Sequence, residues 1–261
     1  MFKLPLLAIA TALLVSSCAT RYATLPADSG PTPDPDVLLK AMSTRLASAK
    51  QYRFTAANTI PKEVAEAQHQ QPKNDVAVVV ARPDKLDVKI SHQGAVAREM
   101  IYDGNTFTVV DGINNFYSKA AHQGTLDTAV AQMTKIYGFQ PPLAEFLLSD
   151  PYRDIKHRVA AITYLGKGEV REGGKTVLCH RIGLAGRLAD AELWLGTADN
   201  LPRRLKATRS NSAGRDLLVD VDFLSWDLNP QVSGSAFRHQ APAGAVEIPM
   251  ITVAEASAAP N

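Results

Sequence analysis

The sequence lacks a strong charge of either sign and the short motifs of the commonest enzyme classes. It has 28 Lys and Arg residues against 26 Asp and Glu residues, and the resulting net charge of +2 is too small to indicate a nucleic-acid partner. We find no nucleophile elbow, zinc-protease helix, phosphate loop or paired Cys-x-x-Cys motif. We therefore expect no enzyme activity, no cofactor, no metal and no nucleic-acid binding.

The chain also lacks a hydrophobic run at its N-terminus that is long enough to span a bilayer. The apolar run from Leu4 to Val15 contains 12 residues, whereas a spanning helix needs about 20. It follows Lys3 and precedes the small residues Ser16 and Ser17, which is the pattern of a cleaved signal peptide. We predict that residues 1–17 are such a peptide.

The chain has only two cysteines, and one of them lies just after the N-terminal apolar run. Val15-Ser16-Ser17-Cys18 resembles the bacterial lipobox, which implies cleavage before Cys18 and attachment of two or three acyl chains. An ordinary secretory signal with an incidental cysteine is the alternative. Ala19 is not the aspartate that signals inner-membrane retention, so the resemblance implies a lipid anchor on the periplasmic side of the outer membrane. Cys179 is then alone, which excludes an intramolecular disulfide.

Composition divides the remaining chain into three parts. Residues 18–33 are polar and rich in proline, so we expect the lipidated cysteine to be followed by a flexible tether. Residues 34–250 form one folded domain, because the hydrophobic fraction of 46% can build a sizeable core. Residues 251–261 are small and polar, and we expect a disordered tail.

Antiparallel strands account for most of the predicted domain. Lys85 to Ile90 alternates polar and apolar residues, and Asp103-Gly104 suits a hairpin turn. Pro61 to Asn74 is polar and is predicted to loop out between two strands. Because the strands follow one another through short turns, we expect one continuous curved sheet in an α+β fold. The clearest strands are 51–60, 76–81, 85–90, 98–102, 106–110, 162–170, 175–184, 190–195, 201–209 and 216–226.

Helices are predicted in three places. Asp34-Pro35 is a capping signal before an apolar face that extends to Ala49. A second helix begins at Thr125 and ends at Gly138, and a short third one follows Pro141-Pro142 until Asp150-Pro151 stops it. The last two carry more apolar surface than a solvated connection needs. We therefore expect them to cover the concave face of the sheet.

The residues that could carry chemistry have simpler explanations. Cys179 and His180 are adjacent on a strand, so they point to opposite faces and cannot act as a nucleophile–base pair. His180 shares the face of Ile182, as a core histidine or as a polar anchor in a ligand cavity. Asp220 and Asp222 could be paired catalytic acids, but cross-strand ion pairs with Arg204 and Lys206 explain them without catalysis.

Several motifs give the chain a family resemblance. They are Arg82-Pro83-Asp84-Lys85, Tyr102-Asp103-Gly104-Asn105-Thr106, Cys179-His180, Glu192-Leu193-Trp194-Leu195, Leu201-Pro202-Arg203-Arg204-Leu205, Ser225-Trp226 and Ala241-Pro242-Ala243-Gly244-Ala245. Together they look like the predicted periplasmic proteins of domain-of-unknown-function family 2092, which look related to the lipoprotein-localisation (LolA/LolB-like) fold. That implies an unclosed barrel of about eleven antiparallel strands with helices over the open side. Family members often have a second histidine after Cys179-His180, where this chain has Arg181.

Two functions follow from this reading. The resemblance implies a binding protein or carrier that holds a lipid, an acyl chain or a lipoprotein segment in the concave face of the sheet. The alternative is a structural or interaction module that holds another envelope protein through the same sheet. The expected ligand-binding residues are His180, Met133, Tyr137, Phe139, Leu143, Phe146 and Leu147.

Overall fold

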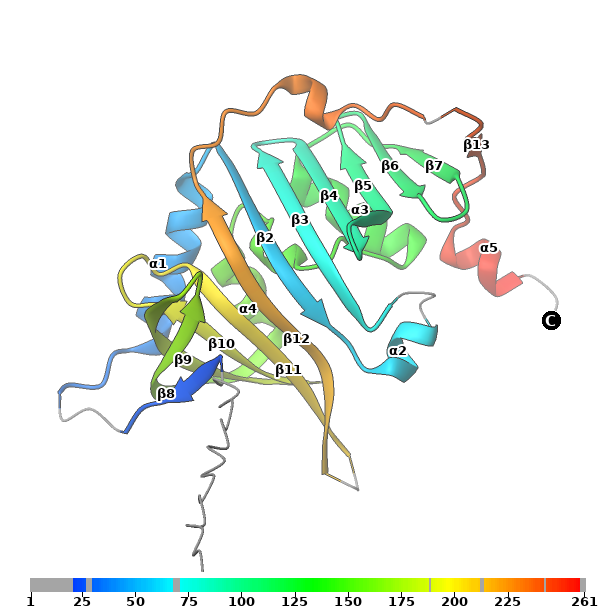
Figure 1. Cartoon of the computed structure of the whole chain (residues 1–261). Coiled ribbons are helices and arrows are strands. Elements are labelled where there is room, and N and C mark those ends of the chain that lie inside the picture. Colours follow the sequence, from blue (N-terminus) through cyan, green and yellow to red (C-terminus); the bar gives the residue numbers. More distant parts are fainter. Residues whose placement is uncertain are drawn as a thin grey trace, which may run out of the picture.

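Figure 1 shows the computed structural model, which describes residues 21–26, 30–67, 71–187, 189–211, 214–241 and 243–258. The predicted signal peptide and Cys18 lie outside the described residues. Within the described part of the chain, no helix has both the length and the apolar character needed to cross a membrane.

A single sheet of 13 strands forms the framework of the domain, in the order β1-β8-β9-β10-β11-β12-β2-β3-β4-β5-β6-β7-β13. All neighbours are antiparallel except β13, which runs parallel to β7. The strands are β1 (Tyr22–Thr24), β2 (Gln51–Thr59), β3 (Lys73–Ala81), β4 (Lys85–His92), β5 (Ala95–Tyr102), β6 (Thr106–Asp111), β7 (Phe116–Ala121), β8 (Val159–Glu172), β9 (Lys175–Gly186), β10 (Asp190–Gly196), β11 (Pro202–Asn211), β12 (Gly214–Asp227) and β13 (Val246–Glu247).

This architecture confirms the predicted unclosed, curved sheet. The order is linear, with β1 and β13 at its two ends, so the barrel does not close. The ten expected strands correspond to β2–β6 and β8–β12, and the three further strands are β7 and the short edge strands β1 and β13.

Helices α1, α3 and α4 and the turn η1 gather on the concave face of the sheet (Figure 1). Buried residues of α1, α3, η1 and α4 join the inner residues of the strands in one hydrophobic core. The helices are α1 (Pro35–Ser48), α2 (Lys62–Ala67), α3 (Leu126–Tyr137), the 3₁₀ turn η1 (Ala144–Phe146), α4 (Pro151–Arg158), the 3₁₀ turn η2 (Gly234–Phe237) and α5 (Val253–Ala258).

Local signals explain where α1 and α3 begin and end. The Asp34 side chain accepts a hydrogen bond from the backbone N–H of Asp36, and Pro35 occupies the first turn of α1. The Thr125 side chain accepts from the N–H of Thr128 at the start of α3. Gly138 ends α3 in the left-handed conformation, at φ 72°, which glycine adopts without strain.

The predicted third helix is wrong in position. Only the single turn η1 forms between Pro141 and Leu148, and the longer helix α4 begins at Pro151. Asp150 does not stop a helix, because its side chain accepts from the N–H of Arg153 and so caps α4. An Asp-Pro pair starts a helix as readily as it ends one.

Three segments expected to be irregular carry structure. Residues 22–24 of the predicted tether form β1, in register with residues 168–170 of β8. The predicted loop 61–74 contains α2 and the first residues of β3, and residues 253–258 of the predicted tail form α5. Apart from β3, these elements have three to six residues, which is too little chain for a hydrophobic period to show.

Candidate ligand cavity

The helices fill one half of the concave face completely. Met133, Phe146 and Leu147 are at most 1% exposed, and the Phe146 ring packs edge-to-face on Phe223 at 5.2 Å between centroids. The Tyr52 hydroxyl donates to the Phe146 carbonyl at 2.8 Å, which fixes η1 against β2. Three of the expected ligand-binding residues therefore lie in the packed core, and their contact with a ligand stays a prediction.

The other half of the concave face is hollow. A cavity of about 710 Å³ lies between the inner faces of β3–β7 and the chain that follows α3. Strand register explains its apolar wall, since Val76 faces Ile90 on the next strand and Met100 faces Val109. The residues that line this apolar cavity include Val76, Ile90, Met100, Val109, Phe139 and Ile248.

Six of the 16 residues that line this apolar cavity are polar or charged. Asn58 lines it from β2, and its Oδ1 atom is buried with no hydrogen-bond partner among the described residues. Arg98 and Asp111 line it from β5 and β6, where they are directly opposite each other. A mainly apolar wall with a smaller number of polar groups is the usual make-up of a small-molecule site.

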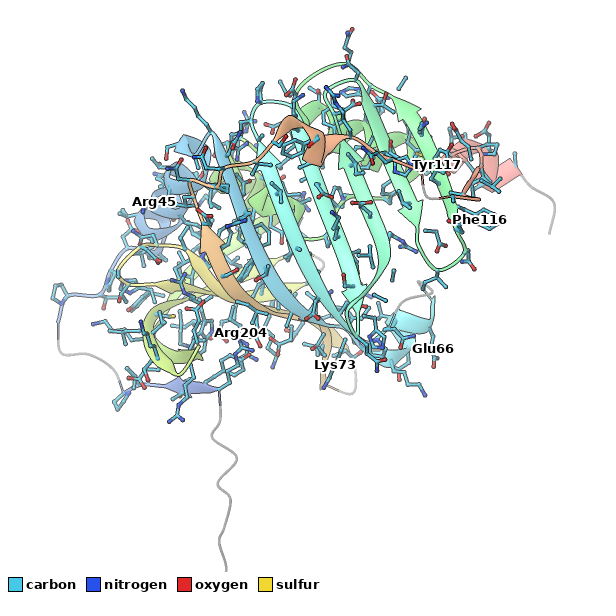
Figure 2. All side chains as sticks on the ribbon, turned by 45° about the horizontal axis from the view of Figure 1, so that its top comes forward. Arg45, Glu66, Lys73, Phe116, Tyr117 and Arg204 are labelled. Atoms are coloured by element: carbon cyan, nitrogen blue, oxygen red, sulfur yellow. The ribbon has the colours of Figure 1, made fainter. Side chains whose placement is uncertain are left out.

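The C-terminal segment forms one rim of the apolar cavity. Val246 donates to the Asn115 carbonyl at 3.0 Å and Ile248 to the Tyr117 carbonyl at 2.8 Å, so β13 adds only two residues to the sheet. Figure 2 labels Phe116 and Tyr117 where this segment meets β7. Phe116 and Ile248 remain 39% and 41% exposed, which gives the rim an apolar surface.

The predicted site residues do not converge on one place. Phe139 lines the apolar cavity, while Tyr137 and Leu143 are half-buried beside the core. His180 lines a separate cavity of about 410 Å³ on the far part of the sheet, where its Nδ1 lies 3.1 Å from the Tyr164 hydroxyl. Burial, aided by the charge of Lys167, lowers the pKa of His180. The sequence showed the apolar content of α3 but not which strands leave space beside it.

Comparison with known sequences identifies the family. The family model described as "Predicted periplasmic protein (DUF2092)" matches residues 36–251. The chain belongs to this family. None of the curated proteins matches the sequence.

Solved structures with a similar shape also exist. An uncharacterized conserved protein from Thermus thermophilus has a TM-score of 0.48 and 11% identity, over 82% of this chain and 97% of that one. The MucA/MucB complex of Pseudomonas aeruginosa gives 0.45 and 15%, over 80% of this chain and 62% of that one. A LolA superfamily protein from Nitrosomonas europaea gives 0.36 and 10%, over 80% and 99%. Likeness at these identities concerns the fold alone.

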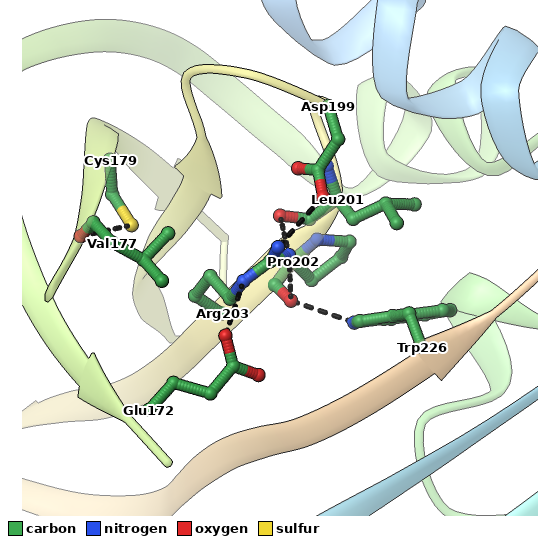
Figure 3. A network of polar contacts seen from close by, with 8 residues as sticks. All are labelled: Glu172, Val177, Cys179, Asp199, Leu201, Pro202, Arg203 and Trp226. Carbon is green, nitrogen blue, oxygen red and sulfur yellow. Dashed lines mark hydrogen bonds and ion pairs between the residues drawn. The ribbon is translucent and has the colours of Figure 1, made fainter. Parts of the chain in front are cut away.

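The Cys-His motif of this DUF2092 chain is divided between the two faces of β9. Cys179 is fully buried as a free thiol, and burial raises its pKa to about 12. Its Sγ lies 3.6 Å from the Val177 carbonyl. Figure 3 shows Cys179 near Arg203, which pairs with Glu172 at 3.2 Å and Asp199 at 2.7 Å. A neutral, packed thiol of this kind is a poor nucleophile.

The two aspartates on β12 are engaged in ion pairs. Arg204 holds Asp220 through two hydrogen bonds, at 3.0 and 2.7 Å, which confirms the expected cross-strand pair. Asp222 instead pairs with Arg21 at 2.9 Å and accepts a hydrogen bond from the Tyr22 hydroxyl. The expected partner of Asp222 was wrong because β1 was not foreseen. Among the described residues, no group of three or more His, Cys, Asp or Glu side chains could hold a metal ion.

Proposed function

We propose that this protein is a periplasmic binding protein that holds an apolar ligand in the concave face of its half-barrel. The ligand is a lipid, an acyl chain or a lipoprotein segment, and lipid on Cys18 tethers the protein to the outer membrane. The observation that supports this proposal is the apolar cavity of about 710 Å³ beside Phe139. Its size falls within the range of about 300–1,000 Å³ that is common for small-molecule sites.

The energetics favour an acyl chain. Each methylene moved from water to an apolar wall contributes about 0.8 kcal/mol, so a chain of moderate length can bind after the costs of ordering are subtracted. The exposed Phe116 and Ile248 at the rim offer apolar contacts to a chain on its way in. The short strand β13 and helix α5, which has no buried residue, leave the C-terminal segment weakly held beside that rim.

Filling the apolar cavity tests the proposal. Val109→Trp places a large side chain in the cavity, and we expect it to reduce binding of a fluorescent fatty acid at least tenfold while circular dichroism stays unchanged. Leu224→Trp is the matched control, because Leu224 is 39% exposed on β12 and lines no part of the cavity. Titration of both variants and the wild type measures the effect.

Native mass spectrometry of the protein taken from the bacterial envelope gives a second measurement, in which a co-purified lipid is expected. If the folded wild-type protein shows neither saturable binding nor a co-purified lipid, the carrier function is wrong. The protein would then act as an interaction module for another envelope protein.

A further inference from the structure

Arg98 lies between two neighbouring hollows. The apolar cavity meets a second hollow of about 750 Å³, and both are lined by Ile90, Arg98 and Asp111. The second hollow has polar side chains along its border, among them Gln71, Asn74, His92 and Asn114, beside apolar ones such as Val96 and Ile113. Arg98 thus stands where the two hollows meet.

The guanidinium of Arg98 is available to a ligand. Arg98 is half-buried on the inner face of β5, and its side chain makes no hydrogen bond or close ion pair with another described residue. The carboxylate of its cross-strand neighbour Asp111 accepts hydrogen bonds from the turn that follows β6. Asp111 Oδ1 accepts from the N–H groups of Ile113 and Asn114, both at 3.0 Å, and Oδ2 accepts from Asn114 Nδ2 at 2.8 Å.

The other charged groups around the second hollow have partners of their own. Glu66, labelled in Figure 2 on α2, lies 3.6 Å from Lys62, and His92 Nδ1 lies 3.0 Å from the Lys73 carbonyl. Partial burial acts to raise the pKa of Asp111, but hydrogen bonds from Asn114 and Ile113 and the charge of Arg98 bring it below its ordinary value. Asp111 is therefore ionised and held in its turn, and Arg98 keeps donors free for an anion.

We propose that the ligand is a single-chain amphiphile with an anionic head group, whose chain fills the apolar cavity and whose head group binds Arg98. This rests on the proposed function and specifies its ligand. Arg98 offers paired N–H donors that match a carboxylate or a phosphate. The unpartnered Oδ1 of Asn58 supplies an acceptor for a hydroxyl or amide of the same ligand. A chain of methylenes fits the wall of Met100, Val109 and Phe139.

Three probes with the same acyl chain measure how much the head group contributes to the binding affinity. Palmitate and palmitoyl-lysophosphatidylglycerol are anionic, one through a carboxylate and one through a phosphate, and monopalmitoylglycerol is neutral. We expect the wild-type protein to bind at least one anionic probe ten times or more tightly than the neutral probe, and the preference to weaken with added salt. The tighter anion identifies which group Arg98 receives.

Variants of Arg98 test whether this side chain causes the preference for an anionic head group. Arg98→Gln should lose about tenfold in affinity for the anionic probe and leave binding of monopalmitoylglycerol unchanged, and Arg98→Lys should recover part of the loss. Arg53→Gln is the control, since Arg53 is exposed on β2 and pairs with Asp227. Circular dichroism checks the fold of each variant.

The outcomes distinguish this inference from the function on which it rests. Equal binding of all three probes by the wild-type protein, or an unchanged anion preference in folded Arg98→Gln, overturns the anionic ligand and leaves the carrier function standing. If no probe binds, both are wrong. The wild-type comparison decides even if a variant fails to fold.

Discussion

Asp87 is a buried carboxylate on β4 whose titration should be visible in protein stability. Its Oδ2 lies 3.2 Å from Lys89 Nζ, and Oδ1 has no partner among the described residues. Burial raises the pKa of Asp87 to about 6 although Lys89 opposes the shift. The folded state therefore binds this proton more tightly than the unfolded chain. The group favours folding below its ordinary pKa of 3.8, and this contribution is lost as the pH rises through about 6.

Asp87→Asn should remove this dependence. Between pH 4 and pH 7 we expect the free energy of unfolding of the variant to rise relative to wild type by about 1–3 kcal/mol. Lys89 keeps a partner in the variant, because Glu99 lies 3.1 Å away. Urea unfolding at several pH values measures the difference, with the exposed Asp75→Asn as control. A constant difference from pH 4 to pH 7 would contradict the raised pKa.

The local sequence pattern around Asp87 does not predict that this side chain is buried. The alternation of Lys85 to Ile90 correctly placed Leu86 and Val88 in the core and predicted that Asp87 faces solvent. Asp87 is instead 5% exposed. The chain after β12 returns over the ends of the strands, and η2, with the buried Phe237, packs against β4 (Figure 1). A contact between segments so distant in sequence leaves no local pattern to detect.

Side-chain contacts, rather than extensive backbone pairing, hold the short strand β1 on the sheet. The Tyr22 ring lies 6.0 Å from that of Trp194, and the Arg204 guanidinium lies 3.6 Å from the centre of the Tyr22 ring. Asp222 receives both Arg21 and the Tyr22 hydroxyl. These contacts dock the first described residues of the chain on the convex face of β8–β12. With three residues of backbone pairing, β1 depends on them.

Asp222→Asn should therefore loosen β1 and leave the sheet intact. Hydrogen bonds to charged groups contribute about 1.5–3 kcal/mol, so amides of residues 22–25 should exchange with deuterium roughly tenfold faster or more. Global unfolding should change little, since β1 is an edge strand. Asp227→Asn is the matched control, because Asp227 lies on the same strand and pairs with Arg53 of β2, which makes no contact with β1. Equal protection of residues 22–25 in both variants would show that Asp222 does not hold β1.

At the scale of elements, length decided what the sequence could predict. The ten expected strands, β2–β6 and β8–β12, have six or more residues, enough for alternation and turn signals to show. Strands β1 and β13 have three and two residues and form because an edge is available beside them. The capping signal at Asp150 was visible but ambiguous, since the apolar residues on both sides of it belong to the core.

At the scale of the whole molecule, the sequence predicted that apolar helices cover the concave face but not how they divide it. Phe146 and Phe139 come from the same apolar stretch, yet one is packed in the core and the other lines the cavity. The difference arises because Tyr52 and Phe223 fix η1 against β2 and β12, while the chain after Gly138 spans the strands β3–β7 more loosely. Only packing in three dimensions determines where space remains.

The docking of β1 also changes how the anchored protein would sit at a membrane. Cys18 precedes Tyr22 by four positions, and an extended chain covers at most about 3.6 Å per residue, or about 14 Å in all. With β1 on the sheet, a lipid on Cys18 would hold the domain close to the bilayer. The tether of residues 18–33 that we expected would have allowed a far longer reach.

Lipidation itself is tested by replacing the cysteine. Cys18→Ser should move the protein from the membrane fraction to the soluble periplasmic fraction, because a signal peptide alone gives no permanent anchor. Cys179→Ser should remain with the membrane, since Cys179 is buried in the folded domain. Ala19→Asp should stay lipidated and shift from the outer to the inner membrane. Fractionation followed by mass spectrometry of the N-terminal peptide measures all three, and a Cys18→Ser protein that still sediments with the outer membrane would rule out the lipid anchor.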